Sequence, residues 1–510
     1  MNRHGWVAAL AAGLVATSLT SAGAAAPTLT SRDFTVTSSI DGTQLVARYY
    51  RPSRAGIYPA VLVPHGGGGT VESEASRAST YASVGLVGVV WSARGHGTSG
   101  GLYDLFGPKT VQDTEDVLQW VISHHAETGA DPYKAGVLGI SQGGGTANLI
   151  AARDPRIKVI APGQTFAGLS ESLHPKGCMK LSVDTAILGA AYTLQGARLD
   201  PTLLAPWTAY LTTGQGGDAV EAQWTSRSPR TYAARTTQPT LWVQAFDDPL
   251  FPVDQAVAMQ ALRGRSDVRL WLSWGGHFAA SSTAPELAQR EAAWTGWLRG
   301  HLQDTALPAL PRVTWWYRAA DGVTLVRRTA PSWPPPGLRS LTLPLVSGTV
   351  AAAGRGAADD PVVAFAGRTA GAGPQLGQVL HALPAHSPAE TLVSTSAPTR
   401  SNVLVAGAPH ASLMWSSTAA DSQLDVKLYD VAPDGSASLL SSGCTAVAGT
   451  AGSPQRVELD LAHTAIEVKA GHRFEVWVKG SDAPTWLPAQ QPAADTVGSG
   501  ARITVPLLSP

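Results

Sequence analysis

The chain has little cysteine, little charge and no excess of either sign of charge. Of its 510 residues only two are cysteines, and charged residues make up 15%, with 37 lysines and arginines against 37 aspartates and glutamates. Two cysteines are too few for a disulfide framework or a thiolate metal site. A neutral balance gives no electrostatic reason to expect nucleic acid or an anionic membrane as a partner. One bridge between Cys178 and Cys444 is possible in an oxidising compartment, but the sequence does not establish it.

The sequence also lacks the short motifs of metal and nucleotide enzymes. It contains no H-E-x-x-H motif and no P-loop. The pair His124-His125 lacks a chelating spacing, because adjacent residues on a helix point in different directions. We therefore expect neither a cofactor nor a metal ion.

Long apolar runs are absent except at the start of the chain. Arg3 and His4 precede an apolar stretch from Trp6 to about Leu19, and small residues follow up to residue 26. This order is typical of a secretory signal peptide, so residues 1–26 are predicted to be cleaved and the mature protein to be secreted or periplasmic, with no membrane partner. The alternative is an uncleaved anchor, but a spanning helix needs ~20 apolar residues.

What the chain does contain is an alternation of strands and helices over residues 27–307. The segment Phe34–Tyr50, with Asp41-Gly42 inside it, predicts an antiparallel hairpin. Short continuous apolar runs then alternate with helix-like stretches, which predicts a parallel sheet with crossover helices. The expected strands are Ala60–Val63, Leu86–Trp91, Ala135–Leu138, Ile157–Ile160, Thr240–Gln244 and Val268–Leu272, and the expected helices are Val111–His125, Gly143–Ala152, Asp254–Leu262 and Pro285–Leu302.

The alternation is interrupted over residues 166–239, a mixed, Gly-rich and Trp-containing stretch with helical pieces such as Val183–Leu194. An insertion between two sheet strands would lie over their carboxyl ends, where an open α/β sheet binds its ligand. We interpret this stretch as a cap on the sheet.

From residue 308 to residue 510 the helical patterns vanish. Short β-like runs separated by Gly, Pro, Asn and Ser clusters predict an all-β sandwich or jelly-roll domain. The expected strands are Leu341–Leu345, Val362–Phe365, Asn402–Val405, Leu424–Tyr429, Arg456–Leu461 and Arg473–Val478, and Ala351–Gly373 is expected to be a loop.

A candidate nucleophile lies between an expected strand and an expected helix. The run Gly139-Ile140-Ser141-Gln142-Gly143 has the G-x-S-x-G pattern of a nucleophile elbow. The tight turn needs small neighbours, and it would place Ser141 at a helix N-terminus, where the dipole favours developing negative charge. The alternative is a Gly/Ser-rich turn without a role.

A serine nucleophile needs a base, and the base needs an orienting acid. Asp247 and Asp248 follow one expected strand and His277 follows the next, in the order serine, acid, histidine that an α/β-hydrolase uses. We favour Asp248 for its position before Leu250-Phe251-Pro252, with Asp247 as the alternative. His277 could otherwise be a surface-loop histidine, and Asp248 a turn residue before a proline.

The oxyanion of the reaction needs two hydrogen-bond donors. We expect the backbone N–H of Gln142 as one, and that of Gly66 or Gly67 as the other, since glycines let the backbone approach a ligand closely. A flexible glycine loop without a role is the alternative. His65 is expected to brace this loop. Arg94 is expected to brace the site through carbonyl groups, with substrate contact as its alternative.

These features together resemble the X-prolyl dipeptidyl-peptidase and cocaine-esterase group. The resemblance covers about residues 32–490. It rests on the elbow, on the spacing of Asp248 and His277, and on five further runs: Asp41-Gly42-Thr43-Gln44-Leu45, Ala93–Gly101, Ser332-Trp333-Pro334-Pro335, Lys427–Gly435 and Ala470–Arg473.

The resemblance implies an α/β-hydrolase domain with a cap, a jelly-roll domain, and a triad of Ser141, Asp248 and His277. It also implies cleavage of esters, or of peptides from the N-terminus. Members commonly carry a tyrosine after the nucleophile and another in the first loop, where this chain has Gln142 and glycines, and Ser92 stands where an aspartate is usual. These departures favour an oxyanion hole made only of backbone donors, and they count against X-Pro specificity.

Three functions are compatible with the sequence. An X-Pro-type peptidase or amidase would need a cap carboxylate for the substrate amine, since a buried ammonium must be paired; Glu171, Asp184 and Asp200 are candidates. A carboxylesterase would have an apolar cap pocket, which Trp207 and Trp224 would suit. A binding protein on a disabled scaffold is disfavoured by the intact serine, aspartate and histidine. The jelly roll could bind carbohydrate or cover the hydrolase domain.

Overall fold

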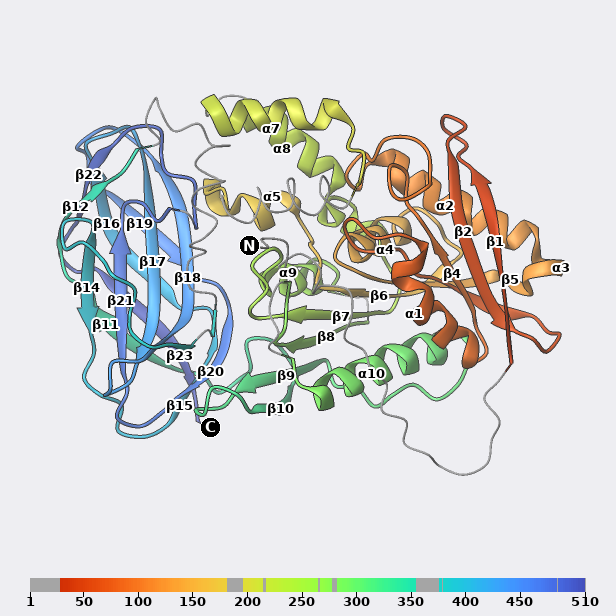
Figure 1. Ribbon diagram of the computed structural model, residues 1–510. Coiled ribbons are helices and arrows are strands. Elements are labelled where there is room, and N and C mark those ends of the chain that lie inside the picture. Colours follow the sequence, from red (N-terminus) through yellow and green to blue (C-terminus); the bar gives the residue numbers. More distant parts are fainter. Residues whose placement is uncertain are drawn as a thin grey trace, which may run out of the picture.

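A mixed α/β half and an all-β half lie side by side (Figure 1). The structure is a computed structural model that describes residues 28–180, 196–213, 217–264, 267–277, 282–354, 376–377, 379–483 and 485–509. The expected signal peptide at residues 1–26, the helix Val183–Leu194 and the strand Val362–Phe365 lie outside these residues.

The first half contains one twisted sheet whose centre is parallel. Its strands follow the order β1-β2-β4-β3-β5-β6-β7-β8-β9-β10, and every neighbouring pair from β4 to β9 is parallel. The first eight are β1 (Leu29–Thr37), β2 (Gln44–Pro52), β3 (Tyr58–Leu62), β4 (Val87–Trp91), β5 (Ala130–Ile140), β6 (Ile157–Gly163), β7 (Thr240–Ala245) and β8 (Val268–Ser273). The expected hairpin and all six expected buried strands are confirmed.

Helices cover both faces of this sheet, because alternate residues of each buried strand point to opposite sides. In β5, Val137 packs in the cluster that contains α2 and α4, whereas Leu138 packs in the cluster that contains α1 and α10. The helices are α1 (Val71–Ser83), α2 (Pro108–Ser123), α3 (His125–Thr128), α4 (Gln142–Ala151), α9 (Asp254–Leu262) and α10 (Ala284–Leu302). The sequence did not indicate α1 or α3. None of the helices in the described ranges is long and apolar enough to cross a membrane.

Between β6 and β7 the described residues form helical segments and no sheet strand. They are α5 (Leu169–Leu173), η1 (Pro175–Gly177), α7 (Pro201–Thr213), α8 (Gly217–Arg227) and η3 (Pro229–Arg235). Figure 1 shows α7 and α8 above the sheet, at the top of the view. Trp207 of α7 and Trp224 of α8 meet edge to face with ring centroids 5.1 Å apart. These aromatic contacts hold the two helices together.

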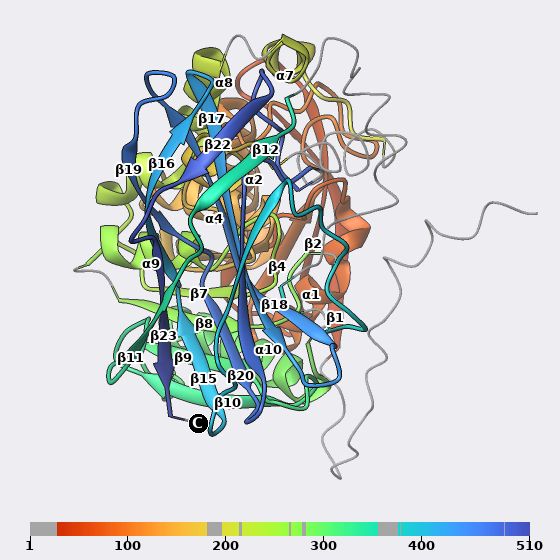
Figure 2. The same ribbon diagram turned by 90° about the vertical axis from the view of Figure 1, so that its left-hand side faces the viewer.

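The second half is a sandwich of two mostly antiparallel sheets (Figure 2). Its core is formed by inward side chains of both sheets, such as Leu404 of one and Val426 of the other. One sheet contains β11 (Arg339–Pro344), β12 (Gly348–Ala352), β15 (Val403–Gly407), β16 (His410–Ser417), β19 (Gln455–Asp460), β20 (Thr464–Val468), β22 (Ala493–Val497) and β23 (Arg502–Leu508); the other contains β13 (Val379–Leu380), β14 (Thr391–Thr395), β17 (Asp421–Val431), β18 (Ala437–Ala448) and β21 (Arg473–Lys479).

One expectation for this half was wrong at its edge. Ala351 and Ala352 were expected to start a loop, but they end strand β12, where they pair with Ala494 and Ala493 of β22. Small side chains can pair in a ladder as long as the backbone groups find partners, so alanine content alone did not exclude a strand.

The two halves are joined in three ways. Strand β9 (Val313–Arg318) and strand β10 (Leu325–Ala330) follow the hydrolase helices but continue the hydrolase sheet, with β9 parallel to β8. Apolar side chains of β7 and β8 share one core with those of the sandwich. Cys178, just after η1, forms a disulfide with Cys444 of β18, with their Cα atoms 6.0 Å apart. The disulfide therefore links the capping segment to the β-sandwich.

Candidate active site

Ser141 occupies the sharp turn between β5 and α4. Its backbone has φ 57° and ψ −121°, a conformation that residues with side chains rarely adopt outside functional turns. The turn closes only because its neighbours lack side chains: a Cβ on Gly139 would lie 2.3 Å from the carbonyl carbon of Gly143, and one on Gly143 would lie 2.1 Å from the carbonyl oxygen of Pro64. The local geometry is that of a nucleophile elbow.

Asp248 and His277 are joined beyond the ends of the next strands. Asp248 Oδ2 lies 2.8 Å from His277 Nδ1, and Asp248 Oδ1 accepts the backbone N–H groups of Leu250 and Phe251 at 3.0 Å each. The buried carboxylate thus fixes one ring nitrogen of His277 as a donor and leaves Nε2 as the basic nitrogen. Ser141, Asp248 and His277 follow β5, β7 and β8, whose carboxyl ends lie on one edge of the sheet.

Asp247, the alternative acid, points elsewhere. Its Oδ1 accepts the backbone N–H groups of Gly275 and Gly276, at 2.8 and 3.1 Å. These two glycines directly precede His277, so Asp247 holds the histidine loop while Asp248 contacts the ring. Sequence reasoning treated the two aspartates as competitors and missed this division.

The glycine loop after β3 lies over the nucleophile. A Cβ on Gly66 would lie 3.9 Å from the Cβ of Ser141, so the Gly66 backbone lies beside the nucleophile. His65 Nδ1 donates to the Gly66 carbonyl at 2.6 Å, and His65 Nε2 accepts the N–H of Ala93 at 3.0 Å. Burial lowers the pKa of His65 to about 3, so the ring stays neutral and keeps both bonds at ordinary pH. His65 thus braces the loop, as the sequence led us to expect.

Gln142 is the first residue of α4 and is buried. The first backbone N–H groups of a helix have no partner within the helix, so the N–H of Gln142 is directed out of the helix beside Ser141. The elbow therefore places one backbone donor beside Ser141, and the backbone of Gly66 lies close to it.

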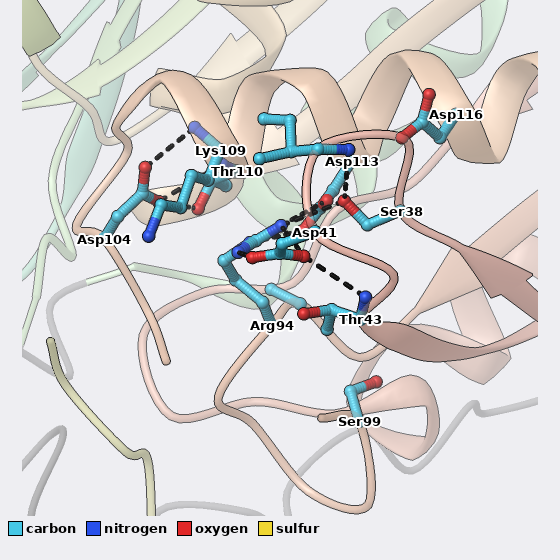
Figure 3. Close-up of polar contacts among 12 residues, drawn as sticks. Ser38, Asp41, Thr43, Arg94, Ser99, Asp104, Lys109, Thr110, Asp113 and Asp116 are labelled. Atoms are coloured by element: carbon cyan, nitrogen blue, oxygen red, sulfur yellow. Dashed lines mark hydrogen bonds and ion pairs between the residues drawn. The ribbon is translucent and has the colours of Figure 1, made fainter. Parts of the chain in front are cut away.

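Arg94 anchors the segment that follows β4 (Figure 3). Its guanidinium makes two hydrogen bonds to Asp113 of α2, at 2.7 and 2.8 Å, and contacts Asp41 at 2.9 Å and Ser38 at 3.0 Å in the β1–β2 loop. The bracing role is therefore made through carboxylates and a hydroxyl rather than carbonyls. Arg94 is only 1% exposed, which leaves no surface for substrate contact. Because Ala93 bonds to His65, the anchored segment also fixes the glycine loop.

A series of ring contacts connects the glycine loop to the candidate base. The sequence carried no periodic signal for it, because its members come from separate loops. Phe166 lies over the first turn of α4, where a Cβ on Gly145 would come within 2.6 Å of its ring. The contacts, with centroid distances, are His65–His96 (4.9 Å), His96–Tyr103 (4.7 Å), Tyr103–Phe106 (6.1 Å), Phe106–Phe166 (4.9 Å), Phe166–Phe251 (5.2 Å) and Phe251–His277 (5.5 Å).

A small pocket with a volume of about 10 Å³, partly open to solvent, lies between the loop at Leu105 and the helices α7 and α8. The described residues that line it are Leu105, Leu199, Leu203, Trp207, Gln223, Trp224 and Arg227. No carboxylate is among these lining residues. In the described ranges, no three His, Cys, Asp or Glu side chains converge to hold a metal ion.

The cap carboxylates considered for amine binding are engaged elsewhere or not described. Glu171 forms an ion pair with Arg230. Asp200 accepts the N–H and the hydroxyl of Thr202, at 3.0 and 2.7 Å. Asp184 lies outside the described residues. Neither described carboxylate faces the pocket as a lining group.

Comparison with known proteins agrees with this architecture. Residues 41–279 match the model of the X-Pro dipeptidyl-peptidase (S15 family), and residues 306–505 match the model of the X-Pro dipeptidyl-peptidase C-terminal non-catalytic domain. No curated protein matches the chain significantly.

Three solved structures share the fold over almost the whole chain. An aminopeptidase from the marine sediment archaeon Thaumarchaeota archaeon is 16% identical, with a TM-score of 0.70, and the match covers 94% of this chain and 97% of that one. A CocE/NonD family hydrolase from Staphylococcus aureus is 13% identical, with a TM-score of 0.68, and the match covers 93% of each chain. An alpha-amino acid ester hydrolase is 17% identical, with a TM-score of 0.67, and the match covers 97% of this chain and 99% of that one. These structures show the shared fold, and the two matched family models show that the chain belongs to the peptidase S15 (X-Pro dipeptidyl-peptidase) family of serine hydrolases.

Proposed function

We propose that the chain is an exported serine hydrolase that cleaves an ester or amide bond through an acyl-enzyme at Ser141. The observation that carries the proposal is the hydrogen bond between Asp248 and His277, 2.8 Å long, at the same sheet edge as the Ser141 elbow. A serine, a histidine and a buried carboxylate in this order are the groups that acyl transfer requires.

In this mechanism His277 Nε2 takes the proton of Ser141 as its hydroxyl attacks the substrate carbonyl. Asp248 holds the ring through Nδ1 and stabilises the imidazolium that forms. The N–H of Gln142, together with that of Gly66 or Gly67, stabilises the oxyanion of the tetrahedral intermediate. His277 then returns the proton to the leaving group, and water hydrolyses the acyl-enzyme by the same steps.

Two substrate classes have support. Membership of the X-Pro dipeptidyl-peptidase family favours a peptide cleaved from its N-terminus. The cap favours small esters or amides with an apolar acyl group, because Trp207 and Trp224 give it an aromatic character and its carboxylates Glu171 and Asp200 are engaged by other partners. We propose the second class, since an ammonium buried without a partner is costly.

The two classes are separated by blocking the amine. We expect short-chain and aromatic nitrophenyl esters to be hydrolysed, and kcat/KM for an Xaa-Pro-nitroanilide to change by less than about tenfold when its amine is acetylated, since no buried carboxylate would be left unpaired. A much larger loss on acetylation, with weak ester turnover, would establish the X-Pro peptidase instead. Ser141→Ala provides the blank for each substrate.

Export is supported by two observations of different kinds. Residues 1–26 have the pattern of a signal peptide, and both cysteines of the chain form one disulfide, which is typical of oxidising compartments. Expressed with its leader, the protein is expected outside the cytoplasm, with its N-terminus near residue 25 or 26 and no free thiol after denaturation. An intact N-terminus together with two titratable thiols would contradict export.

A further inference from the structure

The loop that carries His277 is held by a carboxylate that the proposed chemistry does not use. Asp247 Oδ1 binds the N–H groups of Gly275 and Gly276, and Gln164 Nε2 donates to the Gly275 carbonyl at 2.7 Å. A Cβ on Gly276 would lie 2.5 Å from the Cα of Asp248, so this loop packs directly on the backbone of the acid. A shift of the loop would therefore change the geometry between acid and base.

The other oxygen of Asp247 faces an arginine of β9, the strand that pairs with β8 of the hydrolase sheet and with β20 of the sandwich. Arg318, at the end of β9, has Nη2 4.0 Å from Asp247 Oδ2 and is buried. Its guanidinium lies 4.1 Å from the ring centroid of Trp274, the residue that starts the histidine loop. Burial lowers the pKa of Arg318, which means that the charged form is desolvated here and that the nearby carboxylate offsets part of this cost.

Arg318 is held in turn by the β-sandwich. Its Nη1 donates to the carbonyl of Gly377 at 2.5 Å, and the N–H of Gly377 donates to Leu439 of β18 at 2.8 Å. A Cβ on Gly377 would lie 2.5 Å from Arg318 Nη1 and 2.7 Å from the Trp274 ring, so a bare backbone is needed for this contact. Contacts thus run without interruption from the sandwich sheet to the histidine loop.

We infer that Asp247 is a positioning residue for His277, and that the C-terminal domain holds it in place through Arg318 and Gly377. The inference rests on the proposed function, in which His277 is the base. It assigns a part in setting the active-site geometry to a domain whose family model is described as non-catalytic. Arg318 also neutralises the carboxylate of Asp247, whose negative charge would otherwise repel that of Asp248.

The test compares Asp247→Ala, Asp247→Asn and Arg318→Met by steady-state kinetics on a nitrophenyl ester. Asp247→Ala is expected to lower kcat by about 100-fold with KM within about threefold, because a displaced base loses reaction geometry rather than substrate binding. Asp247→Asn keeps an acceptor oxygen for the two glycine N–H groups and is expected to stay within about tenfold of wild type. Arg318→Met is expected to lower kcat by about tenfold, and to add little in the Asp247→Ala background, because coupled residues are not additive.

The matched control is Asp154→Ala. Asp154 is also buried, accepts a backbone N–H from Arg156 at 2.9 Å and pairs with that arginine, but it precedes β6 and so lies at the opposite edge of the sheet. Its loss is expected to lower thermal stability and leave kcat unchanged.

Three outcomes decide the matter, with folding of each variant checked by thermal melting. Full activity of Asp247→Ala, or equal losses in the alanine and asparagine variants, would overturn the inference while an inactive Ser141→Ala leaves the proposed function standing. If Asp247→Ala does not fold, Asp247→Asn and Arg318→Met decide, and unchanged kcat in Arg318→Met overturns the inference. Retained activity of Ser141→Ala would instead remove the proposed function itself.

Discussion

Replacing Ser141 by alanine is expected to lower kcat by about 10⁶-fold, the scale seen when the nucleophile of a serine hydrolase triad is removed. Without its hydroxyl no acyl-enzyme forms, and the oxyanion donors and the pocket can only bind substrate. Alanine also carries a Cβ, so the strained backbone at φ 57° is no worse than in wild type. Steady-state kinetics on nitrophenyl esters measures the loss.

The control for this variant is Ser123→Ala at the end of α2, an exposed serine that precedes β5, whose opposite end carries the elbow. It is expected to retain the wild-type kcat and KM. Activity of Ser141→Ala within tenfold of wild type, in protein that melts normally, would exclude Ser141 as the nucleophile.

Replacing Asp248 by asparagine is expected to lower kcat by about 10⁴-fold while the fold survives, as is typical when the triad acid becomes an amide. The amide group would donate to His277 Nδ1, so the ring would carry its proton on Nε2 and could no longer accept one from Ser141. KM should change little, because Asp248 does not contact substrate. The pH dependence of kcat and the melting temperature are measured alongside.

The matching experiment is Asp247→Asn, because it also replaces an aspartate by its amide, at the neighbouring position. It keeps its acceptor oxygen for the Gly275 and Gly276 N–H groups and is expected to lose no more than about tenfold. Full activity in Asp248→Asn combined with a 10⁴-fold loss in Asp247→Asn would reverse the assignment of the acid.

The catalytic candidates could be predicted from the sequence because each of them lies in a recognisable local pattern. Ser141 lies in a strand–turn–helix motif, and Asp248 and His277 each follow an apolar strand of a parallel sheet, so all three were expected on one edge. All six buried strands from β3 to β8 begin or end within two residues of the run that predicted them, because buried parallel strands are continuous apolar runs.

The sequence did not predict the contacts that join distant segments. Cys178 and Cys444 are 266 residues apart, and no local pattern shows that they meet. Strand β9 pairs both with β8 and with β20 of the sandwich, so the sheet crosses from one half into the other. Whether Asp247 or Asp248 faces His277 depends on the turn after β7, which adjacent identical residues cannot reveal. The prediction that Arg94 binds carbonyl groups was wrong for a similar reason, because its partners Asp41 and Asp113 lie on other elements that no local pattern brings together.

The departures from the family pattern have a structural counterpart. Where relatives of this type commonly use a tyrosine, Gly66 approaches Ser141 as backbone and a neutral His65 fixes its carbonyl. In the proposed mechanism this arrangement would supply backbone donors in place of a hydroxyl, and it depends on one buried imidazole. We therefore expect substitutions of His65 to lower activity more than substitutions of the glycines beyond Gly67.

The central claim, that Ser141 is the nucleophile, is tested most directly by fluorophosphonate labelling followed by peptide mass spectrometry, which needs no knowledge of the substrate. The account predicts one adduct, on the peptide that contains Ser141, absent in Ser141→Ala and formed much more slowly in His277→Ala. An adduct on another serine, or undiminished labelling of Ser141→Ala, would contradict it.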